Sequence, residues 1–327
     1  MLHDQLVCGQ SRLGYFMRLE WTRILTGRKG SAQVSAAGRE LWKEILATVP
    51  PQFIPLVDCE GRAGTQNDRL TLSDGTIRLQ QPEGDHSEYN PGAFLPKTPW
   101  RKPTEWENTR LWRDSGVTNV DYVGVASIPN ELLAALRDVV RDTDADALRQ
   151  MEPRRIREFI GPLVDYLRDR FAYKSEPFNH GIHVHRPGRE TVTVNTGTGK
   201  YLGLHLDSWD RYPVEARARS LNRICVNIGA EPRHLLFLNL SLMNVARLAQ
   251  ESRGTSNDGY DSVGPAFLSR FPGYPIVKVR IGPGEAYLAP TDNMIHDAST
   301  VGSQSPSITL TLRGWFTVPA VQARGAR

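Results

Sequence analysis

The chain has 327 residues, of which 39% are hydrophobic and 23% charged, a composition typical of a globular protein with one large domain or two small ones. It has no apolar run of about 18 residues and no charged-then-apolar N-terminal segment, so we expect neither a membrane span nor a secretory signal. The net charge of +4 comes from scattered basic residues, which argues against a nucleic-acid-binding surface. Three widely spaced cysteines favour a reducing, cytoplasmic location over a disulfide framework.

The first part of the chain is expected to be helical and rich in loops. Helical patterns appear near 15–27 and 36–48, and again from about 129 to 141 and from about 153, where apolar residues recur at three- and four-residue spacing. The segment 83–94, with its Gly, Asp and Asn residues, is expected to be a loop of the kind that covers a site.

After about residue 175 the hydrophobic period changes to two, which indicates β-strands. Eight short segments with this period are separated by turns that contain Gly or Pro: 182–186, 190–195, 200–207, 222–229, 234–242, 275–281, 284–290 and 307–316. Such a series favours a double-sheet jelly roll or a barrel. The segment 243–262 is expected to hold a short helix and a loop. We expect residues 1–174 to pack on a β core of residues 175–327, forming one catalytic unit.

His205 and Asp207 stand out because they lie two residues apart in a strand pattern, with leucines at the alternate positions. Strand side chains alternate between faces, so both point the same way, and Gly203 leaves room beside them. A metal site needs a third ligand, for which His296 is the best candidate. Two histidines and one carboxylate on one side of a metal form the set found in non-haem Fe(II) oxygenases. The alternative is a hydrogen-bonded core pair without a metal.

Arg313 lies in the strand pattern 307–316, on the same face as Thr309 and Thr311 and opposite a face of Ile and Leu. A buried arginine needs an anionic partner, because an unpaired buried charge is costly. Its planar fork suits a carboxylate bound through two hydrogen bonds. That carboxylate belongs either to a cosubstrate or to an internal Asp or Glu.

With His205-Leu206-Asp207, His296 and Arg313 in this order, the chain resembles the Fe(II)/2-oxoglutarate-dependent dioxygenase superfamily over roughly residues 175–318. The resemblance implies a double-stranded β-helix core (jelly roll, cupin-like) with a helical N-terminal extension, and Fe(II) held by the two histidines and Asp207. It also implies that Arg313 pairs with the far carboxylate of 2-oxoglutarate. Reaction with O2 would then hydroxylate an unactivated C–H bond of an amino acid, peptide or small polar metabolite through an iron(IV)-oxo species.

The resemblance also suggests further contacts. Many relatives carry Ser or Thr two residues after the arginine, where this chain has Trp315, so Thr311 or Thr309 is expected to supply that hydroxyl. Asn195, at the end of a neighbouring strand pattern, is a second candidate for contact with 2-oxoglutarate.

Four residues are candidates for contact with the substrate: Trp209, Asp210, Arg223 and His183. The first two follow the ligand strand directly, and Arg223 would bind either a substrate carboxylate or an internal acid. His183 and His185 alternate like ligands and form a rival metal pair, but no carboxylate stands beside them at strand spacing.

Two other classes of function compete with the oxygenase. One is a cupin-like metal enzyme that does not use 2-oxoglutarate, in which Arg313 binds the substrate directly. The other is a non-catalytic β-sandwich binding module. We expect a small-molecule or peptide substrate and neither a nucleic-acid nor a membrane partner; the sequence does not indicate the oligomeric state.

Overall fold

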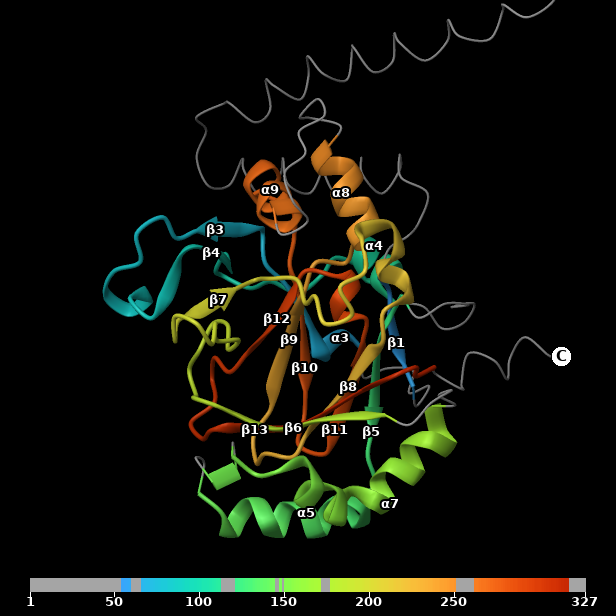
Figure 1. The fold of residues 1–327 in the computed structure, drawn as a ribbon. Helices are drawn as coiled ribbons and strands as arrows, with labels where there is room; N and C mark the ends of the chain where they lie inside the picture. The colour runs from blue at the N-terminus through green and yellow to red at the C-terminus, as the bar shows by residue number, and fades with distance from the viewer. Residues whose placement is uncertain are drawn as a thin grey trace, which may run out of the picture.

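The computed structural model describes residues 54–59, 66–112, 121–144, 147–148, 150–171, 177–250 and 262–317. The helices expected within 15–27 and 36–48 lie outside these residues. The fold combines α-helices with mainly antiparallel sheets, and within the described residues none of the sheets is closed (Figure 1). None of the described helices has both the length and the apolar character needed to cross a membrane.

The described strands form three sheets. The six-stranded sheet has the order β1 (Leu56–Asp58), β5 (Val123–Ser127), β11 (Glu285–Ala289), β8 (Asn222–Asn227), β13 (Ser307–Gly314) and β6 (Phe178–His185). The four-stranded sheet has the order β12 (His296–Ser299), β9 (Arg233–Phe237), β10 (Val277–Ile281) and β2 (Leu70–Leu72). The three-stranded sheet has the order β3 (Thr76–Arg78), β4 (Tyr89–Pro96) and β7 (Tyr201–Gly203). Strands from before residue 175 therefore join all three sheets.

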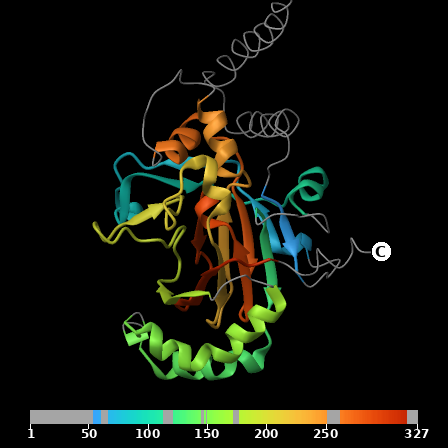
Figure 2. The same cartoon turned by 45° about the vertical axis from the view of Figure 1, so that its right-hand side comes forward.

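The helices gather at two ends of the molecule. Helices α5 (Asn130–Asp142) and α7 (Pro153–Phe171) lie along one side of the sheets, and α8 (Leu242–Gln250) and α9 (Val263–Arg270) lie at the opposite end (Figures 1 and 2). The shorter elements are α3 (Gln66–Arg69), α4 (Glu105–Leu111), η1 (Gly84–His86), η2 (Val214–Arg219) and η4 (Thr291–Asn293). The expected helices near 129–141 and from 153 are confirmed by α5 and α7, and the helix expected after residue 243 by α8.

Three sequence expectations about local structure are wrong. The strand expected over 200–207 ends at Gly203 in β7, so His205 forms an isolated bridge and Asp207 lies beyond the strand. The segment 190–195 forms an isolated bridge at Val194 rather than a strand, because the N–H groups of Val192 and Thr193 donate to the carboxylate of Asp297. The expected loop 83–94 contains most of β4, which pairs with both β3 and β7. Buried Tyr89 and Phe94 stabilise this strand despite the Pro and Gly inside it.

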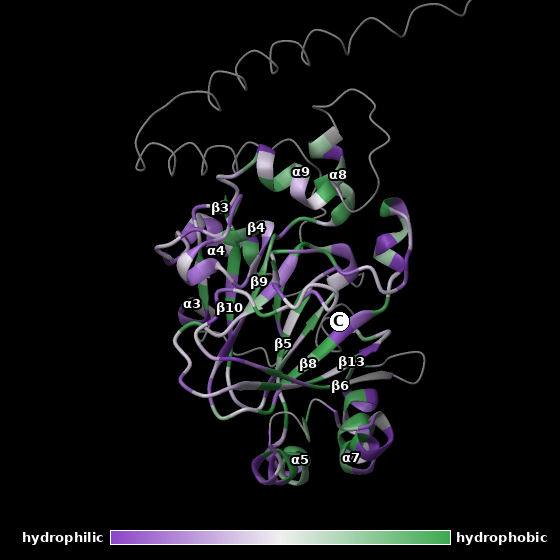
Figure 3. Cartoon of the chain, turned by 60° about the vertical axis from the view of Figure 1, so that its left-hand side comes forward, coloured by the Kyte–Doolittle hydropathy of each residue, from purple (hydrophilic) through white to green (hydrophobic). Residues whose placement is uncertain are grey.

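The six-stranded sheet has one apolar and one polar face. The outer face packs against α5 and α7 through Ile224, Val226, Leu288, Leu310 and Leu312. The apolar sides of the two helices meet it with Leu133, Leu136, Ile156, Ile160, Leu163 and Leu167. In Figure 3 these helices carry both hydrophobic and hydrophilic colour, as expected for helices with one buried side. Each fully buried side chain of this kind contributes about 1.5–3 kcal/mol.

The inner face of the six-stranded sheet looks onto the four-stranded sheet. Its residues follow from the register, in which Tyr287, Cys225 and Thr311 stand side by side, with Arg223 and Arg313 in the next row. Cys225 and Tyr287 share an apolar cluster with Leu235 and Val279 of the four-stranded sheet, which shows that the two sheets face each other. The alternation expected in the strand 307–316, leucines outward and hydroxyls with Arg313 inward, is confirmed.

Candidate metal centre

His205 and His296 are brought together by backbone pairing. The N–H of His205 donates to the carbonyl of His296 at 3.0 Å, and the N–H of His296 donates to the carbonyl of His205 at 2.8 Å. The two imidazole rings lie with their centroids 4.9 Å apart. Because directly paired residues project to the same side of a sheet, this bridge alone places two ring nitrogens next to each other.

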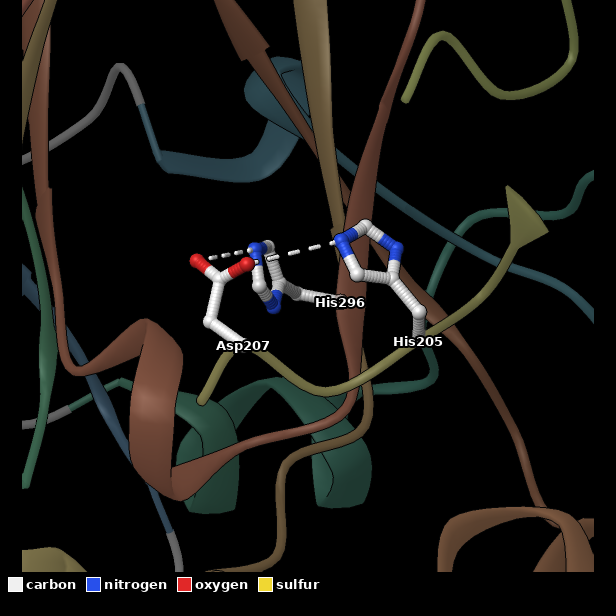
Figure 4. A group of neighbouring side chains, drawn as sticks. All are labelled: His205, Asp207 and His296. Carbon is white, nitrogen blue, oxygen red and sulfur yellow. Dashed lines mark ion pairs between the residues drawn. The ribbon is translucent and has the colours of Figure 1, made fainter. Parts of the chain in front are cut away.

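Asp207 completes a group of three. Its carboxylate faces a nitrogen of each ring, with one oxygen 3.7 Å from Nε2 of His205 and the other 3.6 Å from Nε2 of His296 (Figure 4). The three ligand atoms lie within 4.8 Å of one another, and the described residues hold no other such group of three. The set of residues that the sequence singled out therefore meets in space.

Backbone carbonyls orient both imidazoles. Nδ1 of His205 lies 3.0 Å from the carbonyl oxygen of Gly203, and Nδ1 of His296 lies 3.2 Å from that of Met294. A carbonyl only accepts, so each Nδ1 carries its hydrogen and each Nε2 is available as a ligand. Such outer hydrogen bonds fix ligand histidines at metal sites.

The spacing fits a small divalent cation. Bonds of about 2.1 Å place neighbouring ligand atoms about 3.0 Å apart at right angles and about 3.4 Å apart in a tetrahedron. The separations of 3.6 and 3.7 Å, which run to the two different oxygens of Asp207, are longer than these values, so the side chains would have to move inward to close around an ion. Two imidazoles and one carboxylate leave further coordination positions for exogenous ligands.

The charges around the group favour a cation. Burial would raise the pKa of Asp207, but the charges of Arg223 and His296 outweigh it and hold that pKa well below the usual value. Burial lowers the pKa of His296 to about 4. Burial also opposes charge on His205, yet the neighbouring carboxylates of Asp207 and Asp297 raise its pKa to about 10. Binding of a metal would thus displace one proton from His205.

Gly203 has a backbone that other residues do not adopt easily. Its φ is +78°, and a Cβ at this position would lie 2.6 Å from the carbonyl oxygen of Phe94 in β4. The sequence suggested that Gly203 leaves room beside His205. The structure adds that Gly203 permits close approach to β4 and offers the carbonyl that orients His205.

Asp297, which directly follows the ligand His296 in β12, is a buried partner of His205. Its Oδ2 lies 3.3 Å from Nδ1 of His205, and its Oδ1 accepts from the N–H groups of Val192 and Thr193. With 1% of its surface exposed, it links the ligand His205 to the neighbouring chain segment.

Arg313 is paired inside the protein. One of its terminal nitrogens lies 3.1 Å from a carboxylate oxygen of Asp210 and 3.1 Å from one of Asp292. The internal ion pair that the sequence left open is therefore present. Asp210 also accepts from the N–H of Leu221 at 2.7 Å, so it also stabilises the loop that follows Asp207.

Arg217 holds the same loop from another side. Its guanidinium donates to the carbonyl oxygen of Asp207 at 3.0 Å and to the hydroxyl of Ser208 at 2.9 Å, and it lies 3.8 Å from Asp292. Neither Arg217 nor Asp292 belongs to a strand pattern, so the sequence offered no local signal for them.

The other predicted cosubstrate contacts have local partners. The hydroxyl of Thr311 lies on the inner face, 3.7 Å from Sγ of Cys225. The side-chain oxygen of Asn195 accepts from the N–H of Gly197 and closes a turn.

The remaining substrate candidates lie in three different settings. Arg223 pairs with Asp207 at 2.7 Å, so its partner is an internal acid. Trp209 is 54% exposed, with the guanidinium of Arg313 5.9 Å from its ring centroid. His183 stacks on His185, with ring centroids 6.3 Å apart.

Comparison with known proteins gives no match. No protein-family description matches the chain, and no curated protein matches its sequence.

Proposed function

We propose that this protein is an Fe(II)- and 2-oxoglutarate-dependent oxygenase that hydroxylates an amino acid, a peptide or a small polar metabolite. The observation that carries the proposal is the orientation of the ligand group. Two Nε2 atoms face one carboxylate while each Nδ1 is occupied by a backbone carbonyl.

The path of the chain through the sheets supports a double-stranded β-helix core, which we propose as the fold. From β6 the chain crosses to the bridge at His205, beside β12, and returns to β8 in the six-stranded sheet. It then passes through β9 and β10, back to β11, across to β12 and back to β13. Repeated crossing between two facing sheets is the path of a jelly roll.

Fe(II) bound by His205, Asp207 and His296 would, with 2-oxoglutarate and O2, supply the oxidising chemistry. The chain's own residues prepare the site for it. The carbonyls of Gly203 and Met294 keep both Nε2 atoms directed at the ion, and Arg223 keeps Asp207 ionised. Arg217 fixes the backbone of Asp207, which limits the movement of the carboxylate.

A separate question is which residue binds the far carboxylate of 2-oxoglutarate. The sequence assigned it to Arg313 with Thr311 and Asn195 nearby, and these roles stay predictions. Asp210 and Asp292 already neutralise the guanidinium of Arg313. This pairing weighs equally against the second candidate, a cupin-like metal enzyme that does not use 2-oxoglutarate, because there Arg313 would bind the substrate directly.

Metal binding is the first test. Wild-type protein titrated with Co(II) without oxygen should develop the visible absorption of a bound ion, and His296→Ala should weaken binding by roughly 100-fold or more. His86→Ala is the matched control, because His86-Ser87-Glu88 repeats the His-x-acid spacing in a surface segment. Unchanged Co(II) binding by folded His296→Ala would remove His296 from the ligand set.

Turnover is the second test. Wild-type protein with Fe(II), 2-oxoglutarate and a metabolite extract should form succinate and a product heavier by one oxygen atom. Metal binding without any succinate would favour the cupin-like alternative over the oxygenase.

A further inference from the structure

The arginines near the metal centre differ in how their charge is balanced. Arg223 pairs with the metal-ligand carboxylate, and Arg217 and Arg313 pair with aspartates of the adjoining loops. Arg233, the first residue of β9, has no ion pair with any carboxylate among the described residues.

Arg233 is nevertheless buried. Only 3% of its surface is exposed, and its Nε and Nη1 find no hydrogen-bond partner in the part of the chain that the structure describes. Removing an unpaired cation from water is costly, and buried donors are almost always hydrogen-bonded. A guanidinium kept in this state indicates an anion that binds to the folded protein.

The register of the four-stranded sheet shows which way Arg233 projects. Arg233, Leu235 and Phe237 alternate along β9 and so share one face. Phe237 stands directly opposite His296 in β12. Arg233 therefore projects from the side of the sheet that carries the metal ligand, four residues or about 13 Å farther along the strand.

The inner face of the six-stranded sheet meets Arg233 with neutral polar groups. Burial, together with the charges of Arg223 and Arg233, lowers the pKa of His183 to about 4. Burial likewise raises the pKa of Tyr287, which lies near both arginines, so its hydroxyl stays protonated. No carboxylate is among these neighbours, and the neutral phenol of Tyr287, which already contacts Arg223 and Cys225, lies beside them.

We propose that Arg233, with Tyr287 beside it, binds the far carboxylate of the acid cosubstrate between the two sheets, while Arg313 holds the ligand loop. The identity of the acid rests on the proposed function; the presence of an anion site does not. A dicarboxylate suits the arrangement because one end would reach the metal while the other meets the planar fork of the guanidinium.

The test measures binding of glutarate, a five-carbon dicarboxylate without the keto group, to metal-free protein by calorimetry. Arg233→Met should weaken glutarate binding roughly 100-fold, whereas Arg233→Lys should restore part of the affinity. Arg219→Met alters an exposed arginine and is the matched control. It should leave the affinity for glutarate within about threefold of wild type.

A second readout separates a binding role from a structural one. Because Arg233 is an unpaired buried charge, Arg233→Met should melt at the same or a higher temperature than wild type without ligand. Addition of glutarate should raise the melting temperature of wild type and not that of Arg233→Met. A large loss of stability in Arg233→Met and Arg233→Lys, with glutarate affinity retained, would overturn the proposal.

The outcomes also separate this site from the proposed function. Binding of glutarate that depends on Arg233, without iron-dependent succinate formation, would support the anion site and contradict the oxygenase. Iron-dependent succinate formation with an unchanged requirement for 2-oxoglutarate in Arg233→Met would contradict the anion site and leave the oxygenase in place.

Discussion

The two faces of the six-stranded sheet share the same strands but have opposite chemistry. On β13, Leu310 and Leu312 enter the apolar layer beneath α5 and α7, whereas Thr311 and Arg313 point toward the four-stranded sheet. The outer face gains stability from burial of hydrocarbon. The inner face buries charges and hydroxyls, which favours folding only where each finds a partner.

This difference assigns two tasks to one sheet. The outer layer supplies the stability that allows the inner face to carry charges that a simple core would exclude. Changes on the outer face should therefore alter unfolding without altering metal or acid binding, and changes on the inner face should mainly alter binding and the pH dependence of unfolding.

The largest effect on stability is expected from Leu163→Ala in α7. Leu163 has no exposed surface and belongs to the layer between α7 and the sheet. Its truncation should lower the free energy of unfolding by about 2–5 kcal/mol in urea titration. Glu158→Ala, on the exposed side of α7, is the control and should change it by less than about 0.5 kcal/mol. Loss of Co(II) affinity in folded Leu163→Ala would contradict the claim that the outer face contributes to stability and not to metal binding.

The second effect concerns the backbone that carries the ligand His205. Gly203→Ala should lower the free energy of unfolding by about 2–4 kcal/mol, because it combines an unfavourable positive φ with a contact against β4. Gly199→Ala is matched to it, since Gly199 has a φ of +69° with no atom near its Cβ position. That variant should cost only the roughly 1–2 kcal/mol of the backbone conformation.

Metal affinity distinguishes the two glycines further. Gly203→Ala should weaken Co(II) binding because the Gly203 carbonyl orients His205, and Gly199→Ala should leave it unchanged. Equal Co(II) affinities in both variants would mean that this carbonyl does not position the ligand.

The third effect is a pH dependence that belongs to the inner face. His183 has a pKa of about 4 in the folded protein against 6.5 when unperturbed, so between these values the unfolded chain binds more protons. Its contribution to stability is complete above about pH 6.5 and falls as the pH drops toward 4, by at most about 1.4 kcal/mol per pH unit. Urea titrations between pH 4 and 7 should show a flatter stability profile for His183→Gln than for wild type. Identical profiles for wild type and His183→Gln would contradict the assignment.

The alternation that separates the two faces could be read from the sequence, because a period of two in 307–316 already sorts leucines from hydroxyls. The convergence of His205, Asp207 and His296 followed from residue chemistry and from the resemblance. The partners of Arg313 could not be predicted, since Asp292 and Asp210 lie 21 and 103 positions away without a pattern that links them. Strands such as β1 and β2 have three residues each, too few for any period to appear.

Arg233 is a second residue whose role could not be predicted from the sequence. It follows Pro232 as a single charged residue at the start of an apolar strand, and nothing nearby marks it as unusual. Its significance comes from an absence of partners that only the packed structure reveals.

The smallest expected effect comes from removing a single hydroxyl, that of Thr311, from the inner face. Thr311→Val replaces a buried group whose observed neighbour is the weak acceptor Sγ of Cys225, so the free energy of unfolding should change by no more than about 1 kcal/mol. If Thr311 contacts the acid cosubstrate as predicted, the dissociation constant for glutarate should rise about 2- to 10-fold, the equivalent of one hydrogen bond. Thr309→Val, one strand repeat away on the same face, tests the alternative hydroxyl. Unchanged affinity in both variants would show that neither threonine contacts the acid.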